Sequence, residues 1–333
     1  MLTDRYKRKL DYLRISVTDK CNLRCIYCMP EEGVTLLPHD EVLRNEEFVH
    51  FVEIFHSLGV KKVRFTGGEP LIRKGFVDII ARIRELLPDI ELCLTTNGTL
   101  LGEALDDIYR IKLKKLNISL DTMSRSRFKE ITGRDNFDRV ITNIEKAIDY
   151  NFFDIKINSV LFEESLDELD SLLDYFKDKN IIIRFIERMS FFDNSNTKTF
   201  VSSDKLIEIL RQKGTLRRKE NVDTKVAQMF ELQYLDKYNI KIGVIPPITH
   251  NFCSKCNRLR LTCDGFLKTC LHSSIEYDLK GPYRMDMGDE ALKDIILKAV
   301  SEKPLRHDFD CAVDNNSGCA SIVSGRSMSK IGG

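Results

Sequence analysis

The first part of the chain alternates short β-rich segments with longer amphipathic ones. Apolar residues recur at helical spacing between 45 and 58, where Gly59 is placed to end a helix, and again between 136 and 150. Strands separated by helices imply parallel β/α units. Because a seventh or eighth unit is not evident, the pattern predicts an α/β fold with a partial, six-unit β/α barrel, and a doubly wound open sheet stays an alternative. The six expected strands span residues 13–19, 61–67, 91–97, 116–121, 155–161 and 181–187.

This regularity ends near residue 190. The last stretch, residues 314–333, is rich in Gly and Ser and is typical of a tail that is disordered or laid over the surface. We therefore divide the chain into a barrel at 1–200 and a smaller, β-containing C-terminal region at 201–333. In that region we expect one helix, a pair of strands and a second helix, at 202–214, at 226–232 with 240–246, and at 288–302.

Polar side chains gather where the expected strands end. The C-terminal ends of parallel strands meet at one edge, where loops can vary without disturbing the core, so a reactive site is expected there. A loop-capping role is the alternative for any single position. The residues concerned are Asp19, Thr66, Thr96 with Asn97, Ser119 with Asp121, and Asn158 with Ser159.

The composition changes this picture by what it excludes. The chain has 333 residues, of which 42% are hydrophobic and 31% charged, and its formal net charge is +1. This charge provides no general attraction for nucleic acid or membranes, so an anionic ligand must be held by local charges. No apolar run approaches the roughly 18 residues of a membrane span, and the N-terminus lacks a signal-peptide core. We therefore expect a cytoplasmic protein that binds neither nucleic acid nor membrane.

Ten cysteines give the first indication of chemistry. A reduced chain of this length needs no disulfide framework, so metal binding is the leading interpretation. Six of the cysteines form two compact groups, at 21–28 and 253–270. The remaining four are expected to be packing or surface thiols, and they are Cys93, Cys263, Cys311 and Cys319.

The first group, CNLRCIYC, places Cys21, Cys25 and Cys28 in the loop after the first expected strand. A four-iron, four-sulfur cluster needs one outside ligand on each iron, so three thiolates leave one iron open to a ligand that is not a cysteine. The spacing therefore favours an iron–sulfur cluster with one open position. A zinc site completed by His39 is the alternative.

The second group places Cys253, Cys256 and Cys270 at a CxxC spacing followed by one distant cysteine. No histidine lies between these three residues, so this group also predicts a cluster with one open iron. A CxxC pair with one further cysteine is only moderately specific. A zinc knuckle that uses His250 or His272 therefore remains an alternative.

The sequence Asn-Arg-Leu-Arg at 257–260 lies inside the second cysteine group. Two guanidinium groups at Arg258 and Arg260 suit a polyphosphate or a purine edge better than a structural metal. The position of these arginines therefore suggests that a nucleotide lies beside the second cluster. A salt-bridged strand face is the alternative for both residues.

Several motifs together resemble a known family. CxxxCxxC with an aromatic residue before the last cysteine, and TGGEP at 66–70, are signatures of the radical S-adenosylmethionine (SAM) superfamily. The complete series resembles the GTP 3′,8-cyclase family, which performs the first step of molybdenum cofactor biosynthesis. The resemblance covers nearly the whole chain, and the C-terminal motif is its most specific part. In chain order the motifs are LRISVTDKCNLRCIYCMP, FTGGEPLIR, LTTNG, NISLDT, ITGRD, FCSKCNRLRLTCDG and a terminal IGG.

The resemblance implies two 4Fe-4S clusters and SAM as cofactors, and GTP as substrate. The first cysteine group would hold the cluster that binds SAM, and the second would hold an auxiliary cluster whose open iron accepts the guanine ring. The implied cluster ligands are Cys21, Cys25, Cys28, Cys253, Cys256 and Cys270. The implied SAM contacts are Tyr27, Gly68, Ser119 and Met189, and the implied GTP contacts are Arg14, Arg64, Thr95, Lys156, Arg258, Leu259 and Arg260.

The family's reaction is that of a radical SAM lyase. A 5′-deoxyadenosyl radical removes hydrogen from the ribose 3′ carbon of GTP, and this carbon then attacks carbon 8 of the guanine. The product is (8S)-3′,8-cyclo-7,8-dihydroguanosine 5′-triphosphate. Because the cofactors carry the radical chemistry, no acid/base pair of side chains is expected, and the catalytic role of the protein is to position the two substrates.

The cationic residues also point to a bound triphosphate on physical grounds that do not depend on the family. A triphosphate carries about four negative charges, so a chain with almost no net charge must concentrate several cations to bind it. Arg14, Arg64 and Lys156 come from three expected strands, and a barrel would point them into one volume. Arg184 is a further candidate, and solvated surface charges are the alternative. The segments after Lys156 and Met189 depart from the family's usual sequence, so we expect both loops to be reshaped.

The resemblance also implies partners. These are an electron donor of the flavodoxin or ferredoxin type, a downstream cyclic pyranopterin monophosphate synthase and, as an alternative to a monomer, a homodimer. The terminal Gly332 and Gly333 would enter the active centre, and a frayed terminus is the alternative.

Two rival functions remain. One is a peptide-modifying radical SAM enzyme, which usually carries more C-terminal cysteines, and the other is a zinc-knuckle module, which would need a basic face.

Overall fold

One sheet organises the molecule. The computed structural model describes residues 1–29, 33–189, 200–219, 226–306, 326 and 328–332. Within these residues twelve strands form a single sheet, in the order β12-β11-β10-β1-β2-β3-β4-β5-β6-β9-β8-β7. The strands are β1 (Tyr12–Ser16), β2 (Lys62–Thr66), β3 (Glu91–Thr96), β4 (Lys115–Ser119), β5 (Asp154–Val160), β6 (Ile182–Ile186), β7 (Gly214–Arg218), β8 (Gln228–Tyr234), β9 (Tyr238–Ile245), β10 (Arg258–Leu261), β11 (Phe266–Lys268) and β12 (Tyr277–Asp278).

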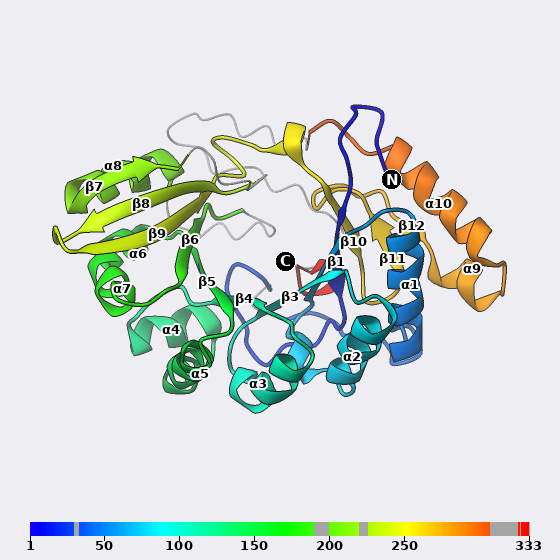
Figure 1. The fold of residues 1–333 in the computed structure, drawn as a ribbon, viewed down its shortest axis with the longest axis horizontal. Coiled ribbons are helices and arrows are strands. Elements are labelled where there is room, and N and C mark those ends of the chain that lie inside the picture. Colours follow the sequence, from blue (N-terminus) through cyan, green and yellow to red (C-terminus); the bar gives the residue numbers. More distant parts are fainter. Residues whose placement is uncertain (30–32, 190–199, 220–225, 307–325, 327, 333) are drawn as a thin grey trace.

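Strands β1 to β6 are the six that the sequence predicts. They run parallel and neighbour one another in chain order. In Figure 1 they curve around the centre of the molecule, with α1, α2, α3 and α5 along their outer side. A doubly wound sheet would instead reverse its strand order and carry helices on both faces. The six-unit partial barrel is therefore confirmed.

The C-terminal half extends the same sheet at both edges. Strand β9 pairs with β6 and strand β10 pairs with β1, both in parallel. Two antiparallel extensions follow, β8 with β7 on one side and β11 with β12 on the other. The predicted strand pair at 226–246 is confirmed as β8 and β9. The division of the chain near residue 200 stays a prediction.

Helices cover the outer face of the sheet. The first begins at Asn45 and ends at Ser57, and Gly59 follows with a positive φ of 100°. A Cβ at Gly59 would lie 2.9 Å from the Cα of Met1, so a larger residue is disfavoured there. The helices are α1 (Asn45–Ser57), α2 (Phe76–Leu86), α3 (Leu101–Arg110), α4 (Arg125–Thr132), α5 (Phe137–Asp149), α6 (Glu163–Asp167), α7 (Leu169–Phe176), α8 (Ser203–Lys213), α9 (Lys280–Arg284), α10 (Asp289–Ser301) and α11 (Met328–Ile331), with short 3₁₀ turns at Pro70–Ile72 and Cys253–Lys255.

The two faces of the central strands differ in chemistry. On β1, Leu13 and Ile15 are fully buried in the hydrophobic core, whereas Tyr12 and Arg14 point to the other side of the sheet. Side chains alternate between the two faces of a strand, so this pattern separates a core face from an inner face. Closed parallel barrels fill the inner face with branched apolar residues. Polar residues on the inner face leave space for a ligand here.

The length of the helices bears on the expectation that the chain does not span a membrane. Among the described residues, no helix is both long and apolar enough to cross a lipid bilayer. The two predicted C-terminal helices are present as α8 and α10.

Candidate functional site

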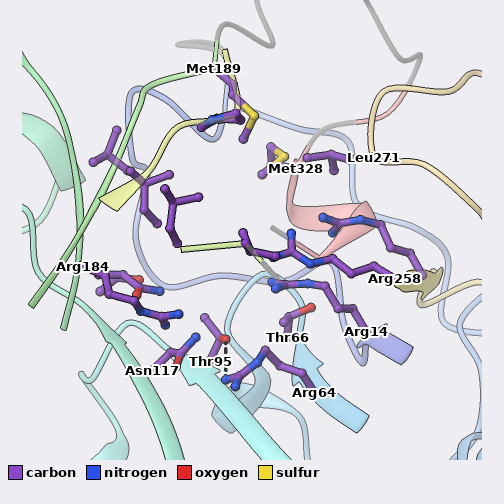
Figure 2. A pocket seen from close by; sticks show the side chains of 18 of the residues that line it. Arg14, Arg64, Thr66, Thr95, Asn117, Arg184, Met189, Arg258, Leu271 and Met328 are labelled. Carbon is purple, nitrogen blue, oxygen red and sulfur yellow. Dashed lines mark hydrogen bonds between the residues drawn. The ribbon is translucent and has the colours of Figure 1, made fainter. Parts of the chain in front are cut away.

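A cavity of about 740 Å³ lies on the inner face of the sheet. Side chains from the first strands, from β6 and from the C-terminal segment approach it from several directions (Figure 2). All six cysteines of the two groups line this one cavity, although the groups lie more than 220 residues apart along the chain. The site therefore combines both groups in one space, between the sheet and the C-terminal region.

The first cysteine group occupies the loop that follows β1. The backbone N–H groups of Cys28 and Met29 donate to the carbonyl of Cys25, at 2.9 and 3.1 Å, and form a tight turn between the last two cysteines. The Sγ of Cys21 accepts from the N–H of Leu23 at 3.4 Å and from the Asn97 amide at 3.8 Å. The loop thus presents three sulfur atoms to the cavity and positions the first of them by hydrogen bonds.

The donor set in this loop fits an iron–sulfur cluster better than a single zinc ion. Within the described part of the chain, no three His, Cys, Asp or Glu side chains converge closely enough to hold one metal ion. A cluster needs its thiolates at separate irons, so three thiols that line one cavity without converging on a single point suit it. His39, the residue considered for zinc, is exposed and does not line the cavity. Burial raises the pKa of the Cys28 thiol to about 12, so a metal that binds this sulfur must displace its proton.

The glycine-rich turn after β2 lies against this loop. A Cβ at Gly68 would overlap the carbonyl oxygen of Lys20, and one at Gly67 would lie 2.6 Å from the carbonyl oxygen of Thr18. Only glycine allows the two backbones to approach this closely. The buried Glu69 accepts hydrogen bonds from Thr96 Oγ1 and from the N–H of Asn97, both at 2.7 Å, so it ties this turn to the end of β3.

The proposed SAM contacts lie along the wall beside the first cysteine group. Tyr27, Gly68, Ser119 and Met189 all line the cavity. The hydroxyl of Tyr27 donates to Asp121 Oδ2 at 2.9 Å, and Asp121 Oδ1 accepts from the N–H of Val160 at 2.8 Å. Burial raises the pKa of Asp121 to about 6. The residues that follow Met189 lie outside the described residues, so the expectation of a reshaped loop there stays a prediction.

The second cysteine group surrounds strand β10. Cys253 and Cys256 flank a 3₁₀ turn, in which the N–H of Cys256 donates to the carbonyl of Cys253 at 3.1 Å. Cys270 follows the antiparallel strand β11 and so returns to the same place. Of the two histidines considered for zinc, His250 is exposed and contacts Asp204 at 3.0 Å, whereas His272 lines the cavity.

Between the two cysteine groups the cavity is strongly cationic. The guanidinium groups of Arg14, Arg64, Arg184 and Arg258 point inward from four different strands (Figure 2). Leu259 lies between two of the candidate arginines, but its side chain is fully buried in the core and does not line the cavity. Only its backbone could contact a ligand. The candidate cations that line the cavity are Arg14, Arg64, Lys156, Arg184, Arg258 and Arg260, and Lys61, Lys62, Lys115 and Arg188 line it as well.

Burial lowers the pKa values of several of these cations. Burial and the neighbouring Arg184 and Arg64 together lower the pKa of Lys156 to about 8. Burial also lowers the pKa of Arg14 to about 10 and that of Arg184 to about 9, and it holds the pKa of Arg260 well below its usual range. Like charges taken out of water are unfavourable unless an opposite charge compensates them. The cavity is therefore suited to a polyanion.

Some polar atoms in the cavity wall have no protein partner. Among the residues that the structure describes, Nε and Nη2 of Arg184, Nε of Arg258 and Oδ1 of Asn158 are buried without a hydrogen bond. Buried polar atoms in proteins are almost always hydrogen-bonded. These atoms are therefore available to a ligand that accepts from guanidinium groups and donates to an amide oxygen.

Thr95 and Thr96 have different surroundings. Thr95 Oγ1 accepts from Arg64 Nη1 at 3.4 Å, and Figure 2 shows this bond on the cavity floor. The hydroxyl of Thr96 instead donates to Glu69. Thr95, the residue that spacing favours as a GTP contact, therefore lies on the same wall as the cations, although both threonines border the cavity.

Several cavity residues lie outside the predicted set, among them Tyr12, Lys62, Glu91 and Lys115. The phenol oxygen of Tyr12 accepts from Arg64 Nε at 2.7 Å, and Glu91 forms ion pairs with both Lys62 and Lys115. Tyr12, Lys62 and Lys115 each precede a cavity residue, Arg14, Arg64 or Asn117, by two positions. Residues two apart on a strand share a face, so this spacing was a usable signal.

The end of the chain lies inside the site. Helix α11 packs beside β1, where Ser16 Oγ donates to the carbonyl of Ser329 at 3.2 Å. Ile331 is fully buried, and Arg260 donates to the carbonyl of Gly332. The expectation of a disordered or superficial tail is therefore wrong for 328–332, because these backbone groups satisfy buried residues of the barrel. Residues 307–325, 327 and 333, which include Cys311 and Cys319, lie outside the described residues.

The isolated cysteines that the structure describes are packing residues. Cys93 and Cys263 are both fully buried, and neither lines the cavity. This agrees with the prediction that they play no part in a metal site.

Two family models match the chain. A model of the radical SAM superfamily matches residues 15–176, and a model described as Molybdenum Cofactor Synthesis C matches residues 181–309. The chain is 39% identical over 309 residues to a GTP 3′,8-cyclase of Clostridium perfringens (strain 13 / Type A), which covers 92% of this chain and 95% of the relative. It is 38% identical over 342 residues to a GTP 3′,8-cyclase of Listeria monocytogenes serovar 1/2a, which covers 100% of this chain and 99% of the relative.

Solved structures share the fold. The crystal structure of Streptococcus suis SuiB bound to S-adenosylmethionine superposes with a TM-score of 0.62 at 15% sequence identity, and the match covers 95% of this chain and 72% of that chain. At this level of identity the likeness establishes the fold alone. The architecture of β1 to β6 with its C-terminal extension is therefore one that other proteins also form.

Proposed function

This chain belongs to the GTP 3′,8-cyclase family of the radical SAM superfamily, and we propose that its cavity holds SAM and GTP together between two 4Fe-4S clusters. The reaction joins carbon 3′ of the GTP ribose to carbon 8 of the guanine and gives 3′,8-cyclo-7,8-dihydroguanosine 5′-triphosphate. This is the first step of molybdenum cofactor biosynthesis. The observation that carries the proposal is the convergence of both cysteine groups and six cationic side chains on one cavity.

The first cysteine group would hold the cluster that binds SAM. Cys21, Cys25 and Cys28 supply three thiolates and leave one iron open. When bound, this cluster and SAM supply the hydrogen abstraction from carbon 3′ that starts the reaction. Gly68 would bring its backbone against SAM, because no side chain separates the β2 turn from the cysteine loop. Tyr27, Ser119 and Met189 would form the rest of that wall.

The cationic wall would hold the triphosphate. Arg14, Arg64 and Lys156 come from β1, β2 and β5, three parallel strands of one sheet, so their positions relative to one another are fixed by the sheet. Arg184 adds two buried nitrogen atoms that lack a protein partner. Charge-assisted hydrogen bonds to phosphate would compensate the cost of burying these cations. Thr95 would add a hydroxyl on the same wall.

The second cysteine group would orient the guanine. Its open iron would accept the purine ring, and Arg258 and Arg260 would border the same end of the nucleotide. Two clusters bound in one cavity would therefore set the distance between the two substrates. Fixed placement of the reacting atoms is the main contribution that the protein itself can make to such a reaction.

The C-terminal segment would close the site. Its carbonyl at Gly332 lies against Arg260, and Met328 lines the cavity. A backbone that fills this space excludes water and other hydrogen donors from the reacting carbon.

We extend the proposal to the partners that the family implies, namely a flavodoxin- or ferredoxin-like electron donor, a cyclic pyranopterin monophosphate synthase that takes the product, and a second copy of the chain. A cytoplasmic location agrees with ten cysteines, of which eight are free thiols in the described residues.

Anaerobic reconstitution followed by mass analysis tests the proposed function. The protein, incubated with SAM, reductant and GTP, should contain about eight irons per chain and form both deoxyadenosine and a cyclised nucleotide. Replacing Cys253, Cys256 and Cys270 together with Ser should leave about half of the iron and keep SAM cleavage, but abolish GTP conversion. Cys263→Ala is the matched control and should keep all the iron. Loss of SAM cleavage in the triple variant would contradict this division of roles.

A further inference from the structure

Lys303 lies behind the second cysteine group. It follows α10 by two residues, and only 2% of its surface is exposed. Its Nζ donates to the carbonyl of Arg258 at 3.1 Å and also to the carbonyl of Thr269. The first carbonyl lies two residues after Cys256, and the second immediately precedes Cys270. One ammonium group therefore holds the two backbone segments that position two of the three thiols.

The charge of this ammonium group has no carboxylate partner. In the part of the chain that the structure describes, Lys303 forms no ion pair, and its two bonds go to neutral carbonyls. A buried ammonium group without an anion is costly, and a carbonyl pair offsets only part of that cost. The acidic groups with the strongest influence on Lys303 are the thiols of Cys256 and Cys270. The lysine is thus placed to face the negative charge of those thiolates and their cluster.

Arg8 supports the same arrangement from the N-terminal segment. Its Nη1 donates to the carbonyls of Cys253 and Leu305, at 2.8 and 2.9 Å, and its Nη2 donates to that of Pro304 at 2.6 Å. This arginine links Cys253, the remaining cysteine of the group, to the segment that carries Lys303. Asp4 already compensates its charge through an ion pair of 2.6 Å. Arg258 and Arg8 also act on Cys256, and Lys303 adds to them a buried cation that forms no ion pair within the described residues.

The first cysteine group has a different electrostatic setting. The charged side chains that act on Cys25 and Cys21 include the buried carboxyl groups of Asp121 and Glu69. Arg24 donates to the carbonyl of Cys21 at 2.7 Å, but this side chain is exposed, so solvent screens its charge. Fixed charge near a cluster changes its reduction potential, because reduction adds one negative charge. A nearby cation stabilises the reduced state, and a nearby anion disfavours it.

We propose that Lys303 is a positioning residue for the second cluster, which fixes the backbone beside Cys256 and Cys270 and keeps the reduction potential of that cluster above the potential of the first. This inference rests on the proposed function, because it presumes that both groups bind clusters. The two clusters would then differ in their readiness to accept an electron, although each has three cysteine ligands. The one with the lower potential is the one suited to reductive cleavage of a sulfonium.

Redox titration followed by electron paramagnetic resonance tests this inference on the full chain. A variant in which Cys21, Cys25 and Cys28 are Ser isolates the second cluster. In that background Lys303→Met should lower the reduction equilibrium constant about tenfold, equivalent to about 59 mV for one electron. Lys303→Arg should restore most of the shift. Lys298→Met, an exposed lysine at the end of the same helix, should leave the potential unchanged.

The outcomes separate the inference from the function. If Lys303→Met keeps the second cluster at an unchanged potential, the inference is wrong while the proposed function stands. If Lys303→Met loses that cluster, Lys303→Arg and Lys303→Gln decide. If Lys303→Arg keeps the cluster and Lys303→Gln loses it, the inference is supported. If Lys303→Gln keeps the cluster at the potential of the parent protein, the inference is wrong. It is also wrong if Lys303→Arg loses the cluster. If the parent protein binds no second cluster at all, the proposed function itself fails.

Discussion

Gly243 on β9 lies directly opposite Arg184 on β6, and a Cβ at residue 243 would stand 2.8 Å from the Cγ of Arg184. Arg184 packs its stem across this glycine and directs its guanidinium into the cavity (Figure 2). The backbone at Gly243 has no positive φ, so the constraint on this position is space alone. A residue without a side chain thus sets where the guanidinium group of Arg184 can lie.

Gly243→Ala should therefore weaken GTP binding without affecting SAM. The added methyl group displaces the Arg184 side chain, and we expect a loss of about tenfold in GTP affinity, or about 1.4 kcal/mol. Equilibrium binding of GTP and SAM to the reconstituted protein would measure both effects. Asn239→Ala, at an exposed position of the same strand, is the control. An equal loss of affinity for both ligands would indicate general damage to the sheet.

GTP binding should also weaken as the pH rises from about 7 to about 9. Burial alone would raise the pKa of Tyr12, but Arg64, Arg14 and Arg258 outweigh burial and lower it to about 8. Lys156, with a pKa also near 8, loses its charge over the same range. A phenolate competes with phosphate for the arginines, and a neutral lysine binds phosphate less well, so both changes act in the same direction. The bound triphosphate favours the protonated form of each group.

Tyr12→Phe isolates one of these contributions. The variant should bind GTP with a shallower pH dependence, because only Lys156 then titrates near pH 8. Isothermal titration calorimetry in two buffers of different ionisation enthalpy would count the protons taken up. The wild type should take up more protons than the variant at about pH 8. Identical uptake would mean that the phenol does not ionise in the free protein.

Glu91→Gln should strengthen the binding of anions at the base of the cavity. Burial would raise the pKa of Glu91, but Lys115 and Lys62 outweigh burial and lower it to about 2, so the carboxylate neutralises both lysines at any working pH. Without it, GTP and inorganic triphosphate should bind several-fold more tightly. The melting temperature should change little, since partly exposed ion pairs contribute roughly 0–1 kcal/mol. Glu85→Gln, which breaks the exposed pair with Arg82, should leave anion binding unchanged.

Gly332→Ala should release the C-terminal segment. Gly332 has a φ of 78°, and a Cβ there would overlap Thr66 Oγ1. We expect faster tryptic cleavage in the tail and a loss of GTP conversion, with SAM cleavage retained. Gly288→Ala provides a matched control, because Gly288 has a φ of 82° but no atom within 4 Å of its Cβ position. Tryptic cleavage as slow in Gly332→Ala as in the control would show that the segment tolerates a side chain.

Local sequence patterns were sufficient for the barrel and the cysteine groups. Alternation and helical spacing depend on residues close in the chain, so the bounds of β1 to β6 agree with the predicted segments to within three residues. The pairing of β10 with β1 depends on contacts across about 240 residues, for which no local pattern exists. The sequence therefore identified Arg258 and Arg260 as site residues without indicating that they extend the barrel sheet.

The remaining differences between the predicted and the observed site also depend on contacts between residues far apart in the chain. Leu259 belongs to the motif, but strand geometry directs its side chain into the core. Tyr12 and Glu91 are found only once the register of the strands is known, because each acts on a cation of a neighbouring strand. The position of residues 328–332 is fixed by hydrogen bonds to their backbone carbonyls. Every residue type has such a carbonyl, so the sequence does not indicate which residues will bind to it. A motif thus indicates which segment contributes to a site, and the fold decides which of its atoms do.

The pairing of β10 with β1 also orders events during protein synthesis. The first strand leaves the ribosome early, but its outer neighbour is translated about 240 residues later. Until then the edge of β1 stays open, and the second thiol group does not yet exist. The two clusters are therefore expected to be loaded in sequence, and assembly of the shared cavity must wait until the second cysteine group has been translated.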